Sequence, residues 1–445
     1  MTKRKESIMF REKSKELLEF IEASPSCFHV IHNIKKRLVK EKFIELREEK
    51  PWILEYGKNY YITRNDSTII AFKIPRSNWN GFQIAASHSD FPSFKIKENP
   101  EIHKEEHYTC LNVEKYGGML FAPWMDRPLS VAGRVIIKKD QKIECKLVNV
   151  DRDLLMIPNV AIHMNRKANE EMKYNPQVDM IPLLGDERIK DGWNQLIAKE
   201  IGVKEKDIIS SDLFLYNRMS GTMWGAEEEY ISSRSLDDLQ CAFGTMEGFV
   251  KTENKNRITM CCIFDNEEVG SGTKQGADST MLSDVMERIC GCMNKTIEER
   301  MIAISNSFLL SADNGHAVHP NHPEKADPTN RPYPNMGVVI KYNANQKYTT
   351  DAVSAGIFKK ICEKAEVPVQ TYMNRSDIPG GSTLGNIANR HVSLNTVDIG
   401  LAQLAMHSCY ETGGVKDTLY LIKACETYFK SSITITENGS YEIQL

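Results

Sequence analysis

Apolar side chains recur along this chain in patterns that alternate between helix and strand. Residues 8–24 carry them at the spacing of an amphipathic helix, and residues 28–40 predict a second helix. Runs rich in Ile, Tyr and Phe predict strands over 60–72 and 82–87. The second of these strands leads directly into a polar tripeptide at 88–90.

The pattern changes between residues 93 and 235. Short β-like pieces such as 131–138 and 143–150 alternate with turns, and long helical stretches are missing. We therefore expect an inserted β-rich domain at 93–235, between a first part of a larger domain at 1–92 and its second part at 236–445.

After Arg234 strands alternate with long helices. This rhythm is typical of a mostly parallel sheet with helices on both faces, and such sheets bind ligands at the carboxyl ends of their strands. The predicted helices are 237–252, 278–292, 351–365 and 416–429, and the predicted strands are 257–264, 301–312, 337–341 and 392–398.

Composition narrows the class of protein. The 445 residues suffice for two domains, and 41% hydrophobic with 26% charged residues is ordinary for a globular protein. A net charge of −3 gives no reason to expect nucleic acid or an anionic membrane as a partner. The basic N-terminus is not followed by an apolar signal segment, and no run is long enough to cross a bilayer, so we expect a cytoplasmic protein. The eleven cysteines form no zinc-finger pair, which favours reduced thiols over disulfides.

The run Asp265-Asn266-Glu267-Glu268-Val269-Gly270 places two adjacent carboxylates just after an apolar segment. Consecutive side chains of an extended segment point in opposite directions. Glu267 and Glu268 can then face two different targets, a metal ion and a water molecule. The alternative is a solvated acidic turn. It is disfavoured because four other segments carry isolated residues of the types that bind metals.

Three of those segments supply acids and a histidine. His88 and Asp90 form a His-x-Asp unit in which the carboxylate can orient a metal-binding imidazole, although most such pairs are surface polar residues. Asp237 lies at the predicted start of a helix, either as an N-cap or as a carboxylate that bridges two metal ions. Asp313 follows the predicted strand 301–312.

Further histidines follow Asp313. His316, His319 and His322 recur at a spacing of three, which can suggest a metal cluster, but Pro320 and Pro323 argue against a helix that would align them. We therefore expect His316 and His319 to line a pocket as donors, and His322 to be peripheral.

The last segments are less specific. His407 is a single histidine in an apolar stretch, either a satisfied core residue or a ligand. The glycine-rich loop at 379–385, which includes Gly381 and Ser382, offers amides and hydroxyls that can hold a carboxylate or carbonyl. The His-Glu-x-x-His helix of single-zinc proteases is absent from the sequence.

Together these segments provide two histidines, two aspartates and a glutamate as ligands, with one glutamate to spare. Two zinc-type ions need two or three such groups each and one shared carboxylate, which leaves the spare acid free to act as a base.

Five motifs resemble, in order and character, those of the aspartyl aminopeptidase / aminopeptidase I family of dinuclear zinc exopeptidases, and the likeness runs from about residue 24 to 425. The motifs are Ser-His-Ser-Asp (87–90), Ser-Leu-Asp-Asp (235–238), Asp-Asn-Glu-Glu-Val-Gly-Ser (265–271), Ser-Ala-Asp-Asn-Gly-His-Ala-Val-His-Pro-Asn (311–321) and Gln-Leu-Ala-Met-His-Ser (403–408).

The resemblance implies a zinc exopeptidase-like fold and a role for each ligand. His88 and Asp313 would bind one divalent ion, Glu268 and His407 the other, and Asp237 would bridge them. Zinc is the expected metal, and cobalt or manganese would suit the same ligands.

The resemblance also implies the catalytic groups. Glu267 would be the general base that activates the attacking water, and Asp90 would orient His88. His163 of the inserted domain would reach the active site of a neighbouring subunit, as an oxyanion donor or as an additional metal ligand. The inserted domain would then serve dimerisation, and dimers would assemble into a dodecamer.

The expected activity is removal of the N-terminal residue from peptides with a free N-terminus. Lys341 matches a lysine that the family associates with acidic first residues, and a cation there would favour Asp or Glu. Two alternatives remain open, a broad or neutral specificity and a dinuclear carboxypeptidase or deacylase of the same fold.

Overall fold

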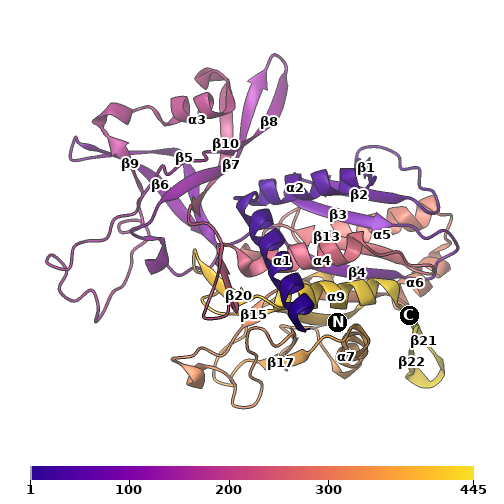
Figure 1. Cartoon of the computed structure of the whole chain (residues 1–445). Coiled ribbons are helices and arrows are strands. Elements are labelled where there is room, and N and C mark those ends of the chain that lie inside the picture. Colours follow the sequence, from indigo (N-terminus) through magenta and orange to yellow (C-terminus); the bar gives the residue numbers. More distant parts are fainter. Residues whose placement is uncertain (1–2, 445) are drawn as a thin grey trace.

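The computed structural model describes residues 3–444 and contains two large sheets in separate parts of the molecule (Figure 1). Within these residues the larger sheet has nine strands in the order β1-β2-β3-β13-β4-β14-β18-β16-β17. Its centre, β13-β4-β14-β18, is parallel, which confirms the predicted mostly parallel sheet. The strands are β1 (Ile44–Leu46), β2 (Asn59–Arg64), β3 (Thr68–Lys73), β4 (Phe82–His88), β13 (Ile258–Phe264), β14 (Phe308–Ala312), β16 (Val338–Tyr342), β17 (Val369–Met373) and β18 (Asn395–Gly400).

Helices cover both faces of this sheet because its strands are apolar on both sides. In β13 the side chains of Cys261 and Ile263 belong to one core, and those of Met260 and Cys262 to the other, as the alternation of a strand requires. The first core is covered by α1 (Lys3–Glu22), α2 (Cys27–Lys40), α4 (Leu236–Val250), α7 (Ala352–Ala365) and α9 (Asp417–Lys430). The second is covered by α5 (Met281–Cys292), α6 (Ile297–Ser305) and α8 (Leu384–Ala388).

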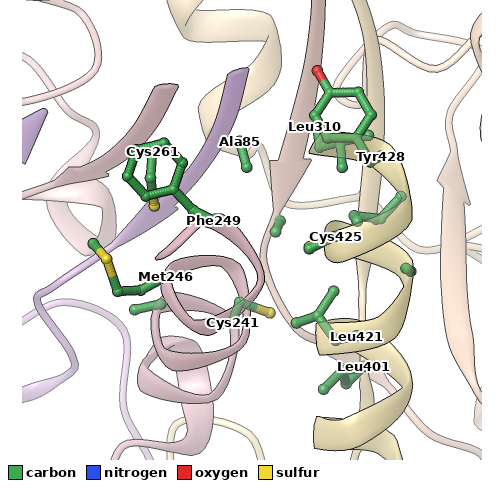
Figure 2. Packing of buried hydrophobic residues seen from close by; sticks show 14 of the residues in the cluster. Ala85, Cys241, Met246, Phe249, Cys261, Leu310, Leu401, Leu421, Cys425 and Tyr428 are labelled. Carbon is green, nitrogen blue, oxygen red and sulfur yellow. The ribbon is translucent and has the colours of Figure 1, made fainter. Parts of the chain in front are cut away.

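Figure 2 shows the packing of α4 on α9 within the first core. Phe249 and Met246 of α4 face the strands, while Leu421 and Cys425 of α9 approach the glycines of α4. A Cβ on Gly248 would lie 2.6 Å from the Cβ of Cys425, so the two helices pack too closely for a larger residue there. This packing fixes α4, whose first turn carries Asp237.

The second sheet is antiparallel and is formed by the segment that the sequence predicts as an insertion. Its order is β8-β7-β10-β5-β6-β9, and it has its own core around Phe94, Trp124 and Leu213. The elements are β5 (Ser93–Lys104), β6 (Tyr108–Tyr116), η1 (Ala122–Trp124), β7 (Leu129–Lys139), β8 (Lys142–Asn149), β9 (Leu183–Asp186), η2 (Glu187–Ile189), α3 (Trp193–Ile201), η3 (Glu205–Asp207) and β10 (Ile208–Asn217).

A three-stranded sheet joins the two parts of the chain. In this sheet β12 (Tyr230–Ser233) lies between β11 (Thr222–Trp224) and β20 (Glu411–Gly414) and pairs with both. The domain division at 92/93 and 235/236 stays a prediction, and β11 and β12 are the segment on which its second boundary depends. The remaining short elements are η4 (Glu267–Val269), β15 (Gly315–His316), η5 (Pro323–Lys325), β19 (Ala402–Gln403), β21 (Ser432–Ile435), η6 (Glu437–Gly439) and β22 (Tyr441–Gln444).

Two predicted strands were wrong in extent. The strand expected over 60–72 is the antiparallel pair β2 and β3, since Asn65 and Asp66 adopt positive φ and turn the chain. The strand expected over 301–312 begins instead as helix α6 and becomes β14 only at Phe308, because Thr296 and Glu299 form a capping box that starts a helix.

No helix among residues 3–444 is long and apolar enough to span a membrane. All eleven cysteines are free, as expected from their spacing.

Candidate metal centre

The ends of the central strands bring the predicted ligands to one edge of the large sheet. β4 ends at His88, β13 ends three residues before Glu267, and β14 ends just before Asp313. Because these strands are parallel, their carboxyl ends lie at the same edge.

Two groups of potential ligands meet there and share one residue. In the first, ligand atoms of His88, Asp237, Asp238 and Asp313 lie within 4.8 Å of one another, and in the second, those of Asp237, Glu268 and His407 do. Asp237 directs one oxygen to each histidine, with Oδ1 3.5 Å from His88 Nε2 and Oδ2 3.4 Å from His407 Nε2. A carboxylate common to two clusters is the arrangement that a pair of metal ions requires.

Glu267 and Glu268 lie on a single 3₁₀ turn, Glu267–Val269, and not on an extended strand. Asn266 before them has φ of 63°, in the left-handed region, which ends the strand and starts the turn. The prediction that strand alternation separates the two side chains was therefore wrong. Both carboxylates face the centre, since atoms of His88, Glu267 and Glu268 also lie within 4.8 Å of one another.

The carboxylate of Asp90 holds the backbone of this turn in place. Its Oδ1 accepts a hydrogen bond from the backbone N–H of Glu267 at 3.1 Å, and its Oδ2 accepts one from Glu268 at 3.2 Å. Oδ1 also lies 3.4 Å from His88 Nδ1, and that nitrogen is 3.1 Å from the backbone carbonyl of Asp90. Asp90 thus contacts the imidazole as expected and also holds the two glutamates.

Sequence reasoning missed a second carboxylate of this kind, Glu411. It is buried, its Oε2 accepts from the backbone N–H of Asp237 at 2.9 Å, and its Oε1 accepts from that of His407 at 2.7 Å. Burial raises its pKa to about 8, against the effect of the two N–H donors. A charged residue in an otherwise apolar stretch was the only signal in the sequence.

Burial and mutual repulsion dominate the electrostatics of the centre. Burial raises the pKa of Glu267 to about 8 despite the nearby His88, and burial together with Asp237 raises that of Glu268. Burial would lower the pKa of His407, but Asp237 raises it to about 9. Asp237 has a lowered pKa although it is buried, because the imidazoles of His407 and His88 lie 3.4 Å and 3.5 Å from its two oxygens.

The residues fit divalent metal ions. Buried oxygens that have no hydrogen-bond partner within the chain are rare and costly, yet Asp237 Oδ1, Asp238 Oδ1 and Glu268 Oε1 are three such atoms in this one centre. Carboxylate and imidazole donors around a shared aspartate are the ligand set that zinc accepts.

Lys341 lies in β16 and is buried, with 2% of its surface exposed. Its ammonium donates to the backbone carbonyls of Asp313 at 2.6 Å and Asn314 at 3.3 Å, and lies 3.5 Å from the Asp313 carboxylate. The acid-binding role predicted for Lys341 stays a prediction, and these contacts point to a second role beside Asp313.

Three predicted substrate-binding residues line one cavity. His316, His319 and Gly381 border a space of about 250 Å³ that also contacts Lys325 and Arg375. Desolvation lowers the pKa of His316, and the charge of Asp237 opposes this shift. Ser382 instead hydrogen-bonds Asn386 at 2.8 Å, and His322 is exposed as expected.

None of the ligand groups found within residues 3–444 contains His163. His163 belongs to the exposed stretch 158–163 of the inserted segment. Its contribution to an active site stays a prediction.

Comparisons with known proteins agree with this geometry. The family model described as aminopeptidase I zinc metalloprotease (M18) matches residues 20–429. The chain is 47% identical over 422 residues to a probable M18 family aminopeptidase 2 of Clostridium novyi (strain NT), covering 93% of this chain and 98% of the relative. A relative of the same name from Pseudomonas syringae pv. tomato is 37% identical over 428 residues, covering 94% and 98%.

Solved structures agree as well. The chain superposes with a TM-score of 0.91 at 34% identity on a protein from the cryo-EM structure of the Ape4 and Nbr1 complex, covering 95% of this chain and 86% of the other. It superposes with a TM-score of 0.84 at 27% identity on the crystal structure of yeast aminopeptidase 1, covering 94% and 97%. A further match with a TM-score of 0.82 at 27% identity is the mApe1 dodecamer of S. cerevisiae, covering 93% and 95%. The chain therefore belongs to the aminopeptidase I (M18) family of zinc metalloproteases and is a metallo-aminopeptidase, a hydrolase that acts on peptides.

Proposed function

We propose that the protein removes the N-terminal residue of peptides with two divalent ions, zinc in the first place, and with Glu267 as general base. His88 and Asp313 would hold one ion, Glu268 and His407 the other, and Asp237 both. The observation that carries this proposal is the sharing of Asp237 between two ligand clusters. The buried oxygens without partners on Asp237 and Glu268 support it.

Bound zinc would supply an electrophile for the scissile carbonyl and would lower the pKa of bound water to about 7. The chain itself supplies the proton transfer. Glu267 lies within reach of the centre and its backbone is fixed by Asp90, so its carboxylate is placed to take a proton from the attacking water and to return it. Such a base contributes roughly 10²–10⁴-fold to the rate.

The Glu267→Gln variant tests this assignment. It keeps the shape and the backbone hydrogen bond to Asp90 but removes the proton acceptor. We expect hydrolysis of aminoacyl-p-nitroanilides to fall by roughly 10²–10⁴-fold while metal content per subunit, measured by mass spectrometry, stays at the wild-type value. Near-normal turnover would refute the role of Glu267 as general base. Loss of metal would show that Glu267 is a metal ligand.

The cavity beside His316 is our candidate for the pocket of the N-terminal side chain. Its lining holds the cations Lys325 and Arg375 and the acid Asp327, and because Arg375 is already paired with Asp377 at 2.7 Å, Lys325 is the cation that favours an acidic substrate side chain. Lys325 lies at its exposed rim, whereas the ammonium of Lys341 already binds two carbonyls. We therefore propose a preference for Asp and Glu that depends on Lys325, with a broad specificity as the alternative.

A substrate panel with N-terminal Asp, Glu, Leu and Lys decides between the two lysines. Lys325→Met should lower kcat/KM for Asp and Glu by about fivefold, the effect of one exposed ion pair, and leave Leu unchanged. Lys341→Met should lower kcat/KM for all four substrates, because it releases Asp313. If Lys341→Met selectively loses cleavage after Asp and Glu, Lys341 and not Lys325 recognises the acidic side chain. If the wild-type protein cleaves all four substrates at equal rates, it has no acidic preference.

We also propose that subunits complete one another. Val160, Ile162 and Met164, which flank His163, expose 52%, 48% and 78% of their surface, and a group of exposed apolar side chains is typical of a protein–protein contact. Contact with a neighbouring subunit would bury them and carry His163 to that subunit's centre. The dodecamer of a relative supports assembly of dimers into the same form.

A further inference from the structure

The segment from Tyr116 to Leu120, called the brace here, leaves the end of strand β6 in the antiparallel sheet and runs along the metal centre. Four of its residues approach groups of the centre. Tyr116 contacts Asp90, Gly117 approaches Glu268, Gly118 approaches His407, and Leu120 hydrogen-bonds His407. The brace belongs to the predicted inserted domain, whereas the groups that it contacts belong to the larger sheet.

The Tyr116 hydroxyl links Asp90 to Asn266, the residue before the turn that carries the two glutamates. It donates to Asp90 Oδ2 at 2.6 Å and accepts from Asn266 Nδ2 at 2.8 Å. Asp90 in turn accepts from the backbone N–H groups of Glu267 and Glu268. The phenol oxygen of Tyr116 therefore restrains both Asn266 and Asp90. Its bond to the Asp90 carboxylate is short, as is typical of a hydrogen bond to a charged group.

Gly117 lets the brace approach Glu268 closely. Gly117 has φ of 76°, which favours glycine, and a Cβ there would lie 3.2 Å from the Cβ of Glu268. A Cβ on Gly118 would lie 4.0 Å from His407 Nδ1. The backbone of the brace thus forms a wall behind two of the proposed ligands.

Leu120 supports His407 at its main chain. His407 has φ of 64°, a strained value for a residue with a side chain. Its carbonyl accepts from the N–H of Leu120 at 3.0 Å, and its own N–H donates to Glu411 at 2.7 Å. The strained conformation is therefore held from both sides, once by the brace.

We propose that Tyr116 is a positioning residue through which the inserted segment sets the geometry of the Glu267–Glu268 turn. The inference rests on the proposed function of that turn. The Tyr116 hydroxyl bonds Asp90 and Asn266, so it would act on the turn through Asp90. Its loss would let Glu267 move away from the position in which it accepts the proton, while substrate contacts in the His316 cavity stay in place.

The test is Tyr116→Phe, which removes only the hydroxyl. The ring keeps its edge-on packing against Phe214, with centroids 5.5 Å apart, so the variant should fold. A cavity of about 280 Å³ borders Tyr116 and Asp90, so water can replace part of the lost bond. We expect kcat to fall by about tenfold with KM unchanged within about twofold, as for a lost hydrogen bond to a charged group.

The control is Tyr108→Phe, at the exposed start of the same strand, with 52% of its surface accessible. A second readout is the visible spectrum of the cobalt-loaded protein, which reports ligand geometry at Glu268 without turnover. It should change in Tyr116→Phe and not in Tyr108→Phe. Because this readout needs no hydrolysis, it tests the brace even if Glu267→Gln shows that the proposed base is wrong.

Wild-type kcat together with a wild-type cobalt spectrum in Tyr116→Phe would overturn the proposal. The proposal would also be overturned if kcat fell only in proportion to a lower Tm while the spectrum stayed unchanged. That result would show that the substitution destabilises the fold and does not alter the metal centre. Lower kcat, unchanged KM and an altered spectrum at an unchanged Tm would support it.

Discussion

Two carboxylates organise the main chain of the centre at the level of single residues. Asp90 binds the N–H groups of Glu267 and Glu268, and Glu411 binds those of Asp237 and His407. In each pair the two bound residues are proposed to act on metal or substrate, and each acceptor fixes both at once. Glu411 lies 174 positions after Asp237 in the chain. The precision of a metal site depends on such groups behind the ligands.

Glu411→Gln should weaken the centre because an amide has one acceptor where the carboxylate has two. Its NH₂ group would face the N–H of Asp237 or of His407, donor against donor. We expect zinc affinity, measured by competition with a chromophoric chelator, to fall by about 10–100-fold. Glu205→Gln, at an exposed position in the inserted segment, is the control. Equal zinc affinity in both variants would show that Glu411 does not position the ligands.

The sequence predicted the candidate ligands better than the groups that hold them. His88, Asp237, Glu268, Asp313 and His407 follow strand ends, begin a helix or belong to specific motifs, and the structure gathers all of them. Tyr116 and Glu411 carry no such mark, since their roles depend on hydrogen bonds between segments far apart in the chain. The partners of Lys341 could not be predicted either, because they are backbone carbonyls.

At the level of elements, periodicity located most helices and the central strands and failed at turns. The break at Asn65 and Asp66 needed recognition of two polar residues with positive φ, and helix α6 needed the Thr296 and Glu299 capping box. The turn at Glu267 depends on the left-handed conformation of Asn266. In these places local turn and cap chemistry outweighed the apolar pattern.

At the level of the whole molecule, the centre is built where two units of the chain meet. Strand β20, which starts at Glu411, pairs with β12, and the brace reaches from the antiparallel sheet to the large one. The sequence predicted both units, but it could not show that residues of the inserted segment support the ligands. Interactions of this kind make the position of the inserted segment part of the catalytic geometry.

The strongest test of the assembly is complementation between two inactive variants. His163→Ala should lose roughly 10²–10³-fold in kcat if the imidazole is an oxyanion donor, and Glu267→Gln should be inactive for a different reason. If His163 serves the neighbouring subunit, a mixed dimer contains one site with both Glu267 and His163 intact. Random pairing makes half of the dimers mixed, so co-expression should restore about a quarter of wild-type activity.

His107→Ala is the matched control, because His107 is another exposed histidine of the inserted segment, in the turn between β5 and β6. It should keep its own activity, and co-expression with Glu267→Gln should add nothing beyond the share of intact sites. If His163 acts within its own subunit, mixed dimers of His163→Ala and Glu267→Gln contain no complete site and stay inactive. Native mass spectrometry that finds mixed dimers without recovered turnover would therefore exclude completion by a neighbour, because both groups would then be present in the assembly but never in one site.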